Sequence, residues 1–170
     1  MNNPTRILLA VALAASLAAC KKEVKETPVA NNDQPVKEQP PVNTVDDGKF
    51  SREDLNSDPC LRQRVVYFDF DRADIKAEAE AILTCHAKFL QDVPDSAMSL
   101  EGHADERGTQ EYNLGLGERR GNAVSQALQA KGGSAAQITV VSFGEERPTC
   151  ADSTEDCWGK NRRVEIVYTK

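Results

Sequence analysis

Beyond residue 64, apolar residues recur with strand-like and helix-like periods in alternation. The run Val65–Phe68 is continuously apolar and is followed by polar residues 69–74, a pattern typical of a buried strand that ends in a loop. From Ile75 to Val93, apolar residues return every three or four positions. This spacing predicts a helix that ends before Pro94.

A second helix and a long loop follow later in the chain. The helix is expected to run from a charged turn to Lys131, because Gly132 and Gly133 stop it there. Gly115 and Gly117 lie inside it, where each costs about 1 kcal/mol relative to alanine. We interpret both as positions that backbone or ligand approaches closely. The remaining expected elements are strands over Met98–His103, Ile138–Phe143 and Val164–Tyr168, and a long loop over 145–160.

The order of these elements predicts the fold class. Strands alternate with helices and two strands then follow in succession, which favours an α/β two-layer sandwich. Its mixed four-stranded sheet has helices packed on one face. Asp71 and Asp105 each follow a strand. In neighbouring parallel strands their side chains would meet at one edge of the sheet, where α/β folds usually bind ligands.

The first 20 residues have the pattern of a processing signal. A basic start precedes an apolar run shorter than the roughly 20 residues of a membrane span. The run ends at Leu17–Cys20, which resembles the lipobox of bacterial lipoproteins. We therefore expect a signal peptide over 1–19 and a permanent lipid anchor on Cys20. By resemblance to known sorting rules, Lys21 indicates the outer membrane of a Gram-negative cell, with the protein facing the periplasm.

Residues 20–59 are expected to form a flexible tether. They are rich in Pro, Asn, Lys and Glu without a sustained apolar period, so they cannot bury enough surface to offset the entropy of ordering. A chain of roughly 40 such residues has an r.m.s. reach of about 35 Å. A short helix is expected near 50–56 within it, because Ser51 and Asp54 have capping-box spacing. A single folded domain is expected over 60–170.

Composition and motifs exclude several functions. A net charge of −6 argues against nucleic acid as a partner, because phosphate binding needs a basic face. The chain has no Gly-x-Ser-x-Gly motif and no Cys/His pair that suggests a nucleophile, so we expect neither an enzyme nor a cofactor. The two histidines, His86 and His103, lack the clustered ligands of a zinc site.

The cysteines that follow Cys20 indicate disulfides. Four remain, and an even count in an oxidising periplasm gives two bridges from three possible pairings. If the first helix runs back along the first strand, Cys85 lies near Cys60, so we expect Cys60–Cys85 and Cys150–Cys157. The second bridge would stabilise the long loop by about 2 to 3 kcal/mol. A metal site is the alternative, but the spacing matches no Cys-x-x-Cys pattern, and we predict no metal.

The stretch from Leu100 to Arg120 carries most of the candidate chemistry. A strand leads into a charged turn and then into a helix, so a carboxylate and a guanidinium come together, as a small zwitterion requires. Four segments resemble the signature of OmpA-C-like peptidoglycan-binding domains: Gly-His-Ala-Asp-Glu-Arg-Gly-Thr (102–109), Tyr-Asn (112–113), Leu-Gly-Glu-Arg-Arg (116–120) and Asn-Arg-Arg (161–163). The resemblance covers about residues 65–168.

The resemblance implies a set of binding residues. Asp105 and Arg120 match the family residues that grip the amino and carboxylate ends of the meso-diaminopimelate side chain, and Asp71 and Leu116 match residues that line the pocket. An ordinary salt bridge that closes the turn is the alternative for Asp105 and Arg120. Asp71 also suits a helix N-terminus, by the helix dipole. Possible supporting residues are Phe70, His103, Thr109, Asn161 and Arg162, of which Asn161 and Arg162 also suit a structural role at the entry to the last strand.

The function implied is that of a non-catalytic lipoprotein that ties the outer membrane to peptidoglycan. The resemblance implies TolB and the other Tol-system proteins as further partners, with a role in envelope integrity and cell division. The alternative is a structural or partner-docking periplasmic lipoprotein that does not bind the wall.

Overall fold

The computed structural model describes residues 48–170. The expected signal peptide, the lipidation site Cys20 and most of the expected tether lie outside these residues. Within the described range, no helix combines the length and the apolar character needed to cross a membrane.

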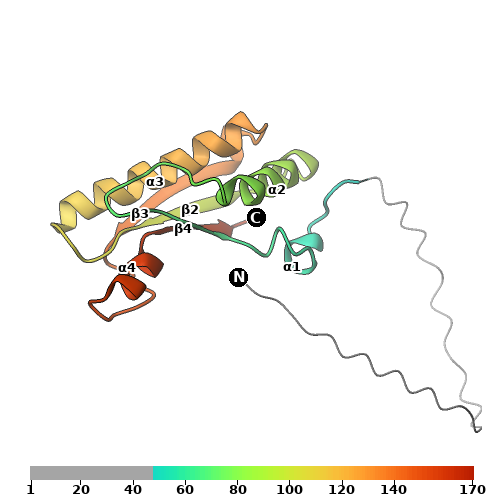
Figure 1. Ribbon diagram of the computed structural model, residues 1–170. Coiled ribbons are helices and arrows are strands. Elements are labelled where there is room, and N and C mark those ends of the chain that lie inside the picture. Colours follow the sequence, from blue (N-terminus) through green and yellow to red (C-terminus); the bar gives the residue numbers. More distant parts are fainter. Residues whose placement is uncertain (1–47) are drawn as a thin grey trace, which may run out of the picture. The chain divides into compact units, whose positions relative to one another are not determined.

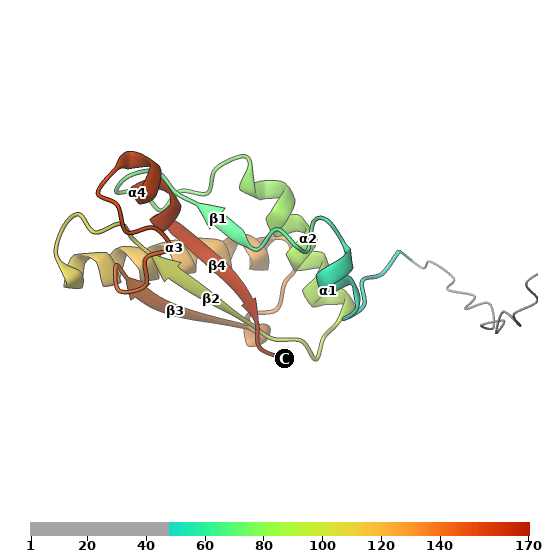
Figure 2. The ribbon, with the colours of Figure 1, turned by 90° about the horizontal axis from the view of Figure 1, so that it is seen from below.

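One four-stranded mixed sheet forms the centre of the fold (Figure 2). Its strands stand in the order β1–β4–β2–β3, with β4 antiparallel to both of its neighbours and β2 parallel to β3. This confirms the predicted fold class. The strands are β1 (Val65–Tyr67), β2 (Met98–His103), β3 (Ile138–Gly144) and β4 (Arg163–Tyr168).

The expectation that the strands before Asp71 and Asp105 are neighbours is wrong. β4 lies between β1 and β2 and runs antiparallel to both, so β1 and β2 still point the same way. The segments that follow them therefore leave the sheet at the same end. The last strand takes the place between them because its buried Val164 and Ile166 complete the apolar face of the sheet.

Two helices, α2 (Ala79–Asp92) and α3 (Gln110–Ala130), cover one face of the sheet (Figure 1). Their apolar stripes pack on the inward residues of the strands, as the periodicity predicted. The first of them begins at Ala79 rather than at Ile75, because the chain before it makes turn hydrogen bonds such as Ala79 N–H to the Lys76 carbonyl, 3.0 Å. The core centres on Leu83, Leu90, Leu100, Val124 and Leu128.

A close backbone contact joins α3 to β2. A Cβ atom added to Gly102 would lie 2.0 Å from the main-chain oxygen of Gly117, and one added to Gly117 would lie 2.4 Å from Ser142 Oγ. The interpretation of Gly117 as a point of close approach is confirmed. For Gly115, the end of the Arg119 side chain at 3.4 Å is the neighbour found among the described residues, so no backbone approach explains that glycine.

A short segment before β1 packs against the end of α2. Ser51 donates two hydrogen bonds to Asp54 at the start of the four-residue helix α1 (Asp54–Ser57), which confirms the expected short helix. The Phe50 amide donates to Asp92 at 2.8 Å, and Leu55 packs on Phe89 and its apolar neighbours. The packed structure therefore begins near Phe50, ahead of residue 60, where the domain was expected to start.

Both predicted disulfides are present. Cys60 joins Cys85 across Cα atoms 6.3 Å apart, and Cys150 joins Cys157 across 5.0 Å. Asp152 lies close to the second pair, with ligand atoms within 4.8 Å of one another. Since both sulfur atoms are bonded to each other, they offer no thiolate to a metal ion.

The segment 145–160, expected to be a loop, contains the helix α4 (Glu155–Asn161). Thr154 caps it by accepting a hydrogen bond from the Cys157 amide at 3.4 Å, and two acidic residues occupy its first turn. The helix lies beside the start of β4 (Figure 1). It has only two buried residues, so it leaves no apolar period in the sequence.

Candidate ligand-binding site

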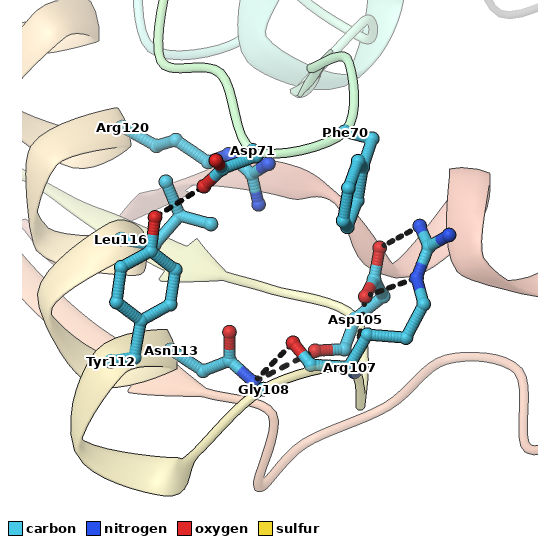
Figure 3. A pocket seen from close by; sticks show the side chains of 9 residues that line it. All are labelled: Phe70, Asp71, Asp105, Arg107, Gly108, Tyr112, Asn113, Leu116 and Arg120. Carbon is cyan, nitrogen blue, oxygen red and sulfur yellow. Dashed lines mark hydrogen bonds and ion pairs between the residues drawn. The ribbon is translucent and has the colours of Figure 1, made fainter.

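A cavity of about 220 Å³ opens where the chain leaves β1 and β2 (Figure 3). The four residues predicted to bind ligand all line it, although the first is more than 30 positions away from the others in the sequence: Asp71, Asp105, Leu116 and Arg120. Phe70 lies at its mouth and is 56% exposed. The cavity thus combines carboxylates, guanidinium groups and apolar side chains within one small volume.

Asp71 projects from the loop between β1 and α2. Its φ of 56° lies in the left-handed region, which aspartate tolerates better than most residues. The Tyr112 hydroxyl, on the first turn of α3, donates a hydrogen bond to its carboxylate. Among the described residues Asp71 forms no ion pair, so its negative charge is available to a ligand.

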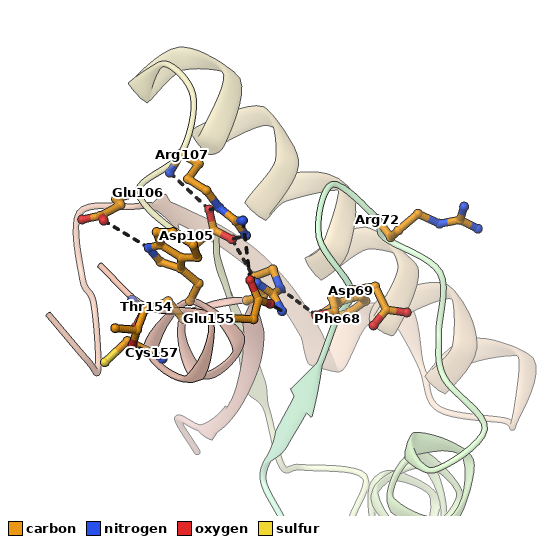
Figure 4. Close-up of polar contacts among 12 residues, drawn as sticks. Phe68, Asp69, Arg72, Asp105, Glu106, Arg107, Thr154, Glu155 and Cys157 are labelled. Carbon is orange, nitrogen blue, oxygen red and sulfur yellow. Dashed lines mark hydrogen bonds and ion pairs between the residues drawn. The ribbon is translucent and has the colours of Figure 1, made fainter. Parts of the chain in front are cut away.

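Asp105 is 4% exposed and carries two arginine partners. Arg107 donates through Nε at 3.0 Å and Nη2 at 2.7 Å, and Arg162 donates through Nη1 at 3.3 Å (Figure 4). Burial alone would raise the pKa of this carboxyl, but the hydrogen bonds from the two arginines outweigh burial and lower it. Asp105 is therefore ionised at neutral pH, with its charge largely balanced within the protein.

Arg120 lies beneath the cavity and is fully buried. Its guanidinium donates to three main-chain carbonyls, those of Arg72 at 2.8 Å, His103 at 2.8 Å and Asp69 at 3.0 Å. Burial lowers its pKa to about 10, which leaves it charged at neutral pH. The side chain therefore ties the β1–α2 loop to the end of β2 and places a positive charge under the cavity. Direct hydrogen bonding to a ligand stays a prediction.

Arg107 is a lining residue that the sequence analysis did not select. Its side chain is 30% exposed, so a ligand reaches it more readily than it reaches Arg120. The guanidinium carbon lies 4.0 Å from the ring centre of Phe70 and 4.1 Å from that of Trp158. The available signal was its position two residues after Asp105 in a turn, a spacing at which a side chain can fold back onto the carboxylate.

Three of the five possible supporting residues hold the site from outside the cavity. Thr109 caps α3 by accepting a hydrogen bond from the Tyr112 amide at 3.2 Å. Arg162 donates to the Phe68 carbonyl at 3.1 Å as well as to Asp105, so it links the ends of β1 and β2. Asn161 accepts from the main chain of the loop at Cys150, 3.1 Å, and donates back to its carbonyl at 2.7 Å.

His103 does not line the cavity. Its ring is buried beside Phe143, with centroids 5.6 Å apart, and neither ring nitrogen has a hydrogen-bond partner among the described residues. Burial, with a smaller effect of the charge on Arg163, lowers its pKa to about 4. The side chain therefore serves packing, while its main-chain carbonyl accepts from Arg120.

His103 predicts an acid-sensitive stability. An unfolded histidine titrates near pH 6.5, and the folded ring resists protonation until about pH 4. The unfolded state then binds more protons between these values, so stability is fully present above about pH 6.5 and falls as the pH drops towards 4. Allowing for partial solvation, we expect a loss of about 2 kcal/mol from this group.

Urea unfolding at pH 7.5 and pH 4.5 checks this loss. The His103→Leu variant should lose most of this pH dependence, and the residual slope reports other groups such as His86, whose nitrogens contact Tyr168 and Gln63. A variant that keeps the full wild-type difference between the two pH values contradicts the assignment.

A family model described as the OmpA family matches residues 67–162, more than half of the chain. The chain therefore belongs to the OmpA family. The motifs that resemble the signature of this family lie at the end of β2, in the turn after it, on α3 and at the start of β4.

Within that family, the similarity is to peptidoglycan-associated lipoproteins. The protein of that name from Pasteurella multocida is 38% identical over 99% of this chain and 100% of its own length, and the one from Pseudomonas aeruginosa is 49% identical over 66% and 67%. The crystal structure of the peptidoglycan-associated lipoprotein from Burkholderia pseudomallei is 42% identical, with a TM-score of 0.66, covering 67% of this chain and 98% of that one.

Proposed function

We propose that this protein binds peptidoglycan non-covalently by holding the diaminopimelate group of a stem peptide in the cavity. The observation that carries the proposal is the grouping of Asp71, Asp105, Arg107 and Arg120 around one small volume. Two carboxylates and two guanidinium groups suit a ligand end that bears both an ammonium and a carboxylate. The names of the similar lipoproteins support association with peptidoglycan.

The two charged ends of the ligand would take different partners. Asp71, which lacks an arginine partner among the described residues, receives the ammonium together with Asp105. Arg107 donates to the carboxylate from the cavity wall, and the buried charge of Arg120 stabilises it from below. Leu116 packs against the methylene chain. Each charge-assisted hydrogen bond contributes about 1.5 to 3 kcal/mol.

In this proposal, the protein links two layers of the envelope, the outer membrane and the peptidoglycan wall. A lipid on Cys20 would hold the chain in the outer membrane, and residues 20–59 would let the domain reach the wall. Because the anchor confines the domain near its ligand, many individually weak contacts add up. TolB and the other Tol-system proteins are the further partners we propose, with a role in envelope integrity and division.

Titration with muropeptides tests the proposal. Lysine-type stems lack the side-chain carboxylate of diaminopimelate, so we expect the diaminopimelate type to bind about 10- to 100-fold more tightly, as one charge-assisted hydrogen bond implies. Asp71→Asn should weaken binding by about tenfold, because the substitution removes the charge while asparagine accepts the same backbone conformation. Isothermal titration calorimetry on the full chain measures both.

Asp74→Asn is the matched control. Asp74 lies on the same loop and pairs with Arg72 at 2.7 Å, but it does not line the cavity. Its replacement should leave the affinity unchanged. Equal binding of both muropeptide types, or equal affinities for the Asp71→Asn and Asp74→Asn variants, rules out the proposed ligand contact.

One observation favours a second candidate function. Asp105 is already paired with Arg107 and Arg162, which is the arrangement expected of a salt bridge that only closes the turn. A partner-docking lipoprotein without wall binding would have such a site. Capture of purified TolB by the full chain, together with no muropeptide binding, would support this alternative.

A further inference from the structure

Side chains of α4 converge on the turn that carries Asp105. Trp158 stacks on Arg107 at 4.1 Å and donates through Nε1 to Glu106 at 3.1 Å. Glu155 accepts from Arg162 at 2.6 Å and lies 3.6 Å from Arg107 Nη1 (Figure 4). The helix thus contacts both arginines that hold the Asp105 carboxylate.

Arg107 depends on these contacts for its position. The side chain is partly exposed, and fixing it in one conformation loses up to about 2 kcal/mol of rotamer entropy. Phe70 supplies one ring contact from the β1–α2 loop and Trp158 supplies the other from α4. Removing the Trp158 ring would free one side of the guanidinium to water and weaken its paired hydrogen bonds to Asp105.

The helix itself is held by few contacts. It has seven residues, of which Cys157 and Asn161 are buried. Two kinds of contact join α4 to the loop that precedes it: the disulfide from Cys157 to Cys150, and the hydrogen bonds between Asn161 and Cys150. A helix this short is not stable by itself, so the disulfide and these hydrogen bonds keep Trp158 in place.

We propose that α4 is part of the binding site: Trp158 and Glu155 are positioning residues that hold Arg107 against Asp105, and the Cys150–Cys157 disulfide keeps the helix where it can do so. The inference rests on the proposed function, since it makes Arg107 a contact for the ligand carboxylate. It extends the site to a segment outside the residues that line the cavity.

Variants at Trp158 test the ring contact. We expect Trp158→Ala to weaken binding of a diaminopimelate-type muropeptide by about tenfold, and Trp158→Phe, which keeps a ring, to stay within about threefold of the wild type. Tyr67→Ala is the control, because Tyr67 is a surface aromatic, 48% exposed, that does not line the cavity. Its affinity should equal that of the wild type. An unchanged affinity in Trp158→Ala overturns the proposal.

A measurement without ligand separates this inference from the proposed function. NMR titration of the Asp105 carboxyl should show a raised pKa in Trp158→Ala, because burial persists while the Arg107 hydrogen bonds weaken. An unmoved pKa overturns the inference, even where binding falls. If the wild type binds no muropeptide, the proposed function fails and the pKa of Asp105 still decides whether α4 positions Arg107.

Paired disulfide variants test the role of the loop closure. Replacing Cys150 and Cys157 together by serine should weaken binding about five- to tenfold and raise the pKa of Asp105. Replacing Cys60 and Cys85 together should lower the melting temperature while leaving the affinity unchanged, because that bridge ties α2 to the segment before β1. Equal affinities in the two double variants, measured well below their melting temperatures, contradict the assignment.

Discussion

Gly102→Ala is expected to lower the free energy of unfolding by at least about 4 kcal/mol. The new methyl group would lie 2.0 Å from the main-chain oxygen of Gly117 and 2.6 Å from its carbonyl carbon. Both atoms belong to the backbone of α3, so no side-chain rotation relieves the overlap and the whole helix must move away from β2. Since α3 also carries Leu116 and Arg120, the cavity should deform with it.

Chemical denaturation of the full chain measures this loss, and Gly115→Ala is the control on the same helix. Within residues 48–170, the flexible end of Arg119, at 3.4 Å, is the one neighbour of a Cβ at Gly115, so alanine fits there. Alanine also raises helix propensity, and we expect a gain of up to about 1 kcal/mol. Similar stabilities for the Gly102→Ala and Gly115→Ala variants would show that the close contact between α3 and β2 does not limit the fold.

Local patterns were enough to predict most elements of this fold. The strand β2 was predicted with its observed limits, and the charged turn and the Gly132–Gly133 pair placed the ends of α3 to within a residue or two. The pattern failed for α4, which buries only two residues and depends instead on the Thr154 cap and a disulfide. The pattern also did not predict the order of the strands, since the insertion of β4 between β1 and β2 depends on pairs of residues that are about 60 to 100 positions apart in the sequence.

The candidate site, too, was predicted from the sequence only in part. The charged turn and the helix after it identified Asp105 and Arg120, and both line one cavity. The sequence did not show which arginine pairs with Asp105. Arg107 and Arg162 do so, whereas Arg120 donates to carbonyls 17 to 51 residues away. These choices depend on side-chain direction, which spacing along the chain does not specify.

The role of Arg120 predicts a second large effect. Arg120→Ala removes the donors to the carbonyls of Asp69, Arg72 and His103 and leaves a cavity under the loop. Unsatisfied buried acceptors cost about 1 to 3 kcal/mol each, and partial hydration reduces the sum, so we expect a loss of about 3 to 5 kcal/mol. Arg119→Ala, at the exposed neighbouring position, should change stability by less than about 0.5 kcal/mol.

Arg120→Lys separates the two parts that this residue plays. Lysine keeps the positive charge beneath the cavity but cannot reproduce the planar set of donors, so stability should fall by about half as much as in the alanine variant. If the charge of Arg120 stabilises the ligand carboxylate, muropeptide affinity should survive better in Arg120→Lys than in Arg120→Met, which keeps the volume without the charge. Both affinities are measured by calorimetry below the melting temperature of each variant. Equal affinities for the lysine and methionine variants would mean that Arg120 only ties the β1–α2 loop to β2, and that Arg107 alone supplies the positive charge the ligand meets.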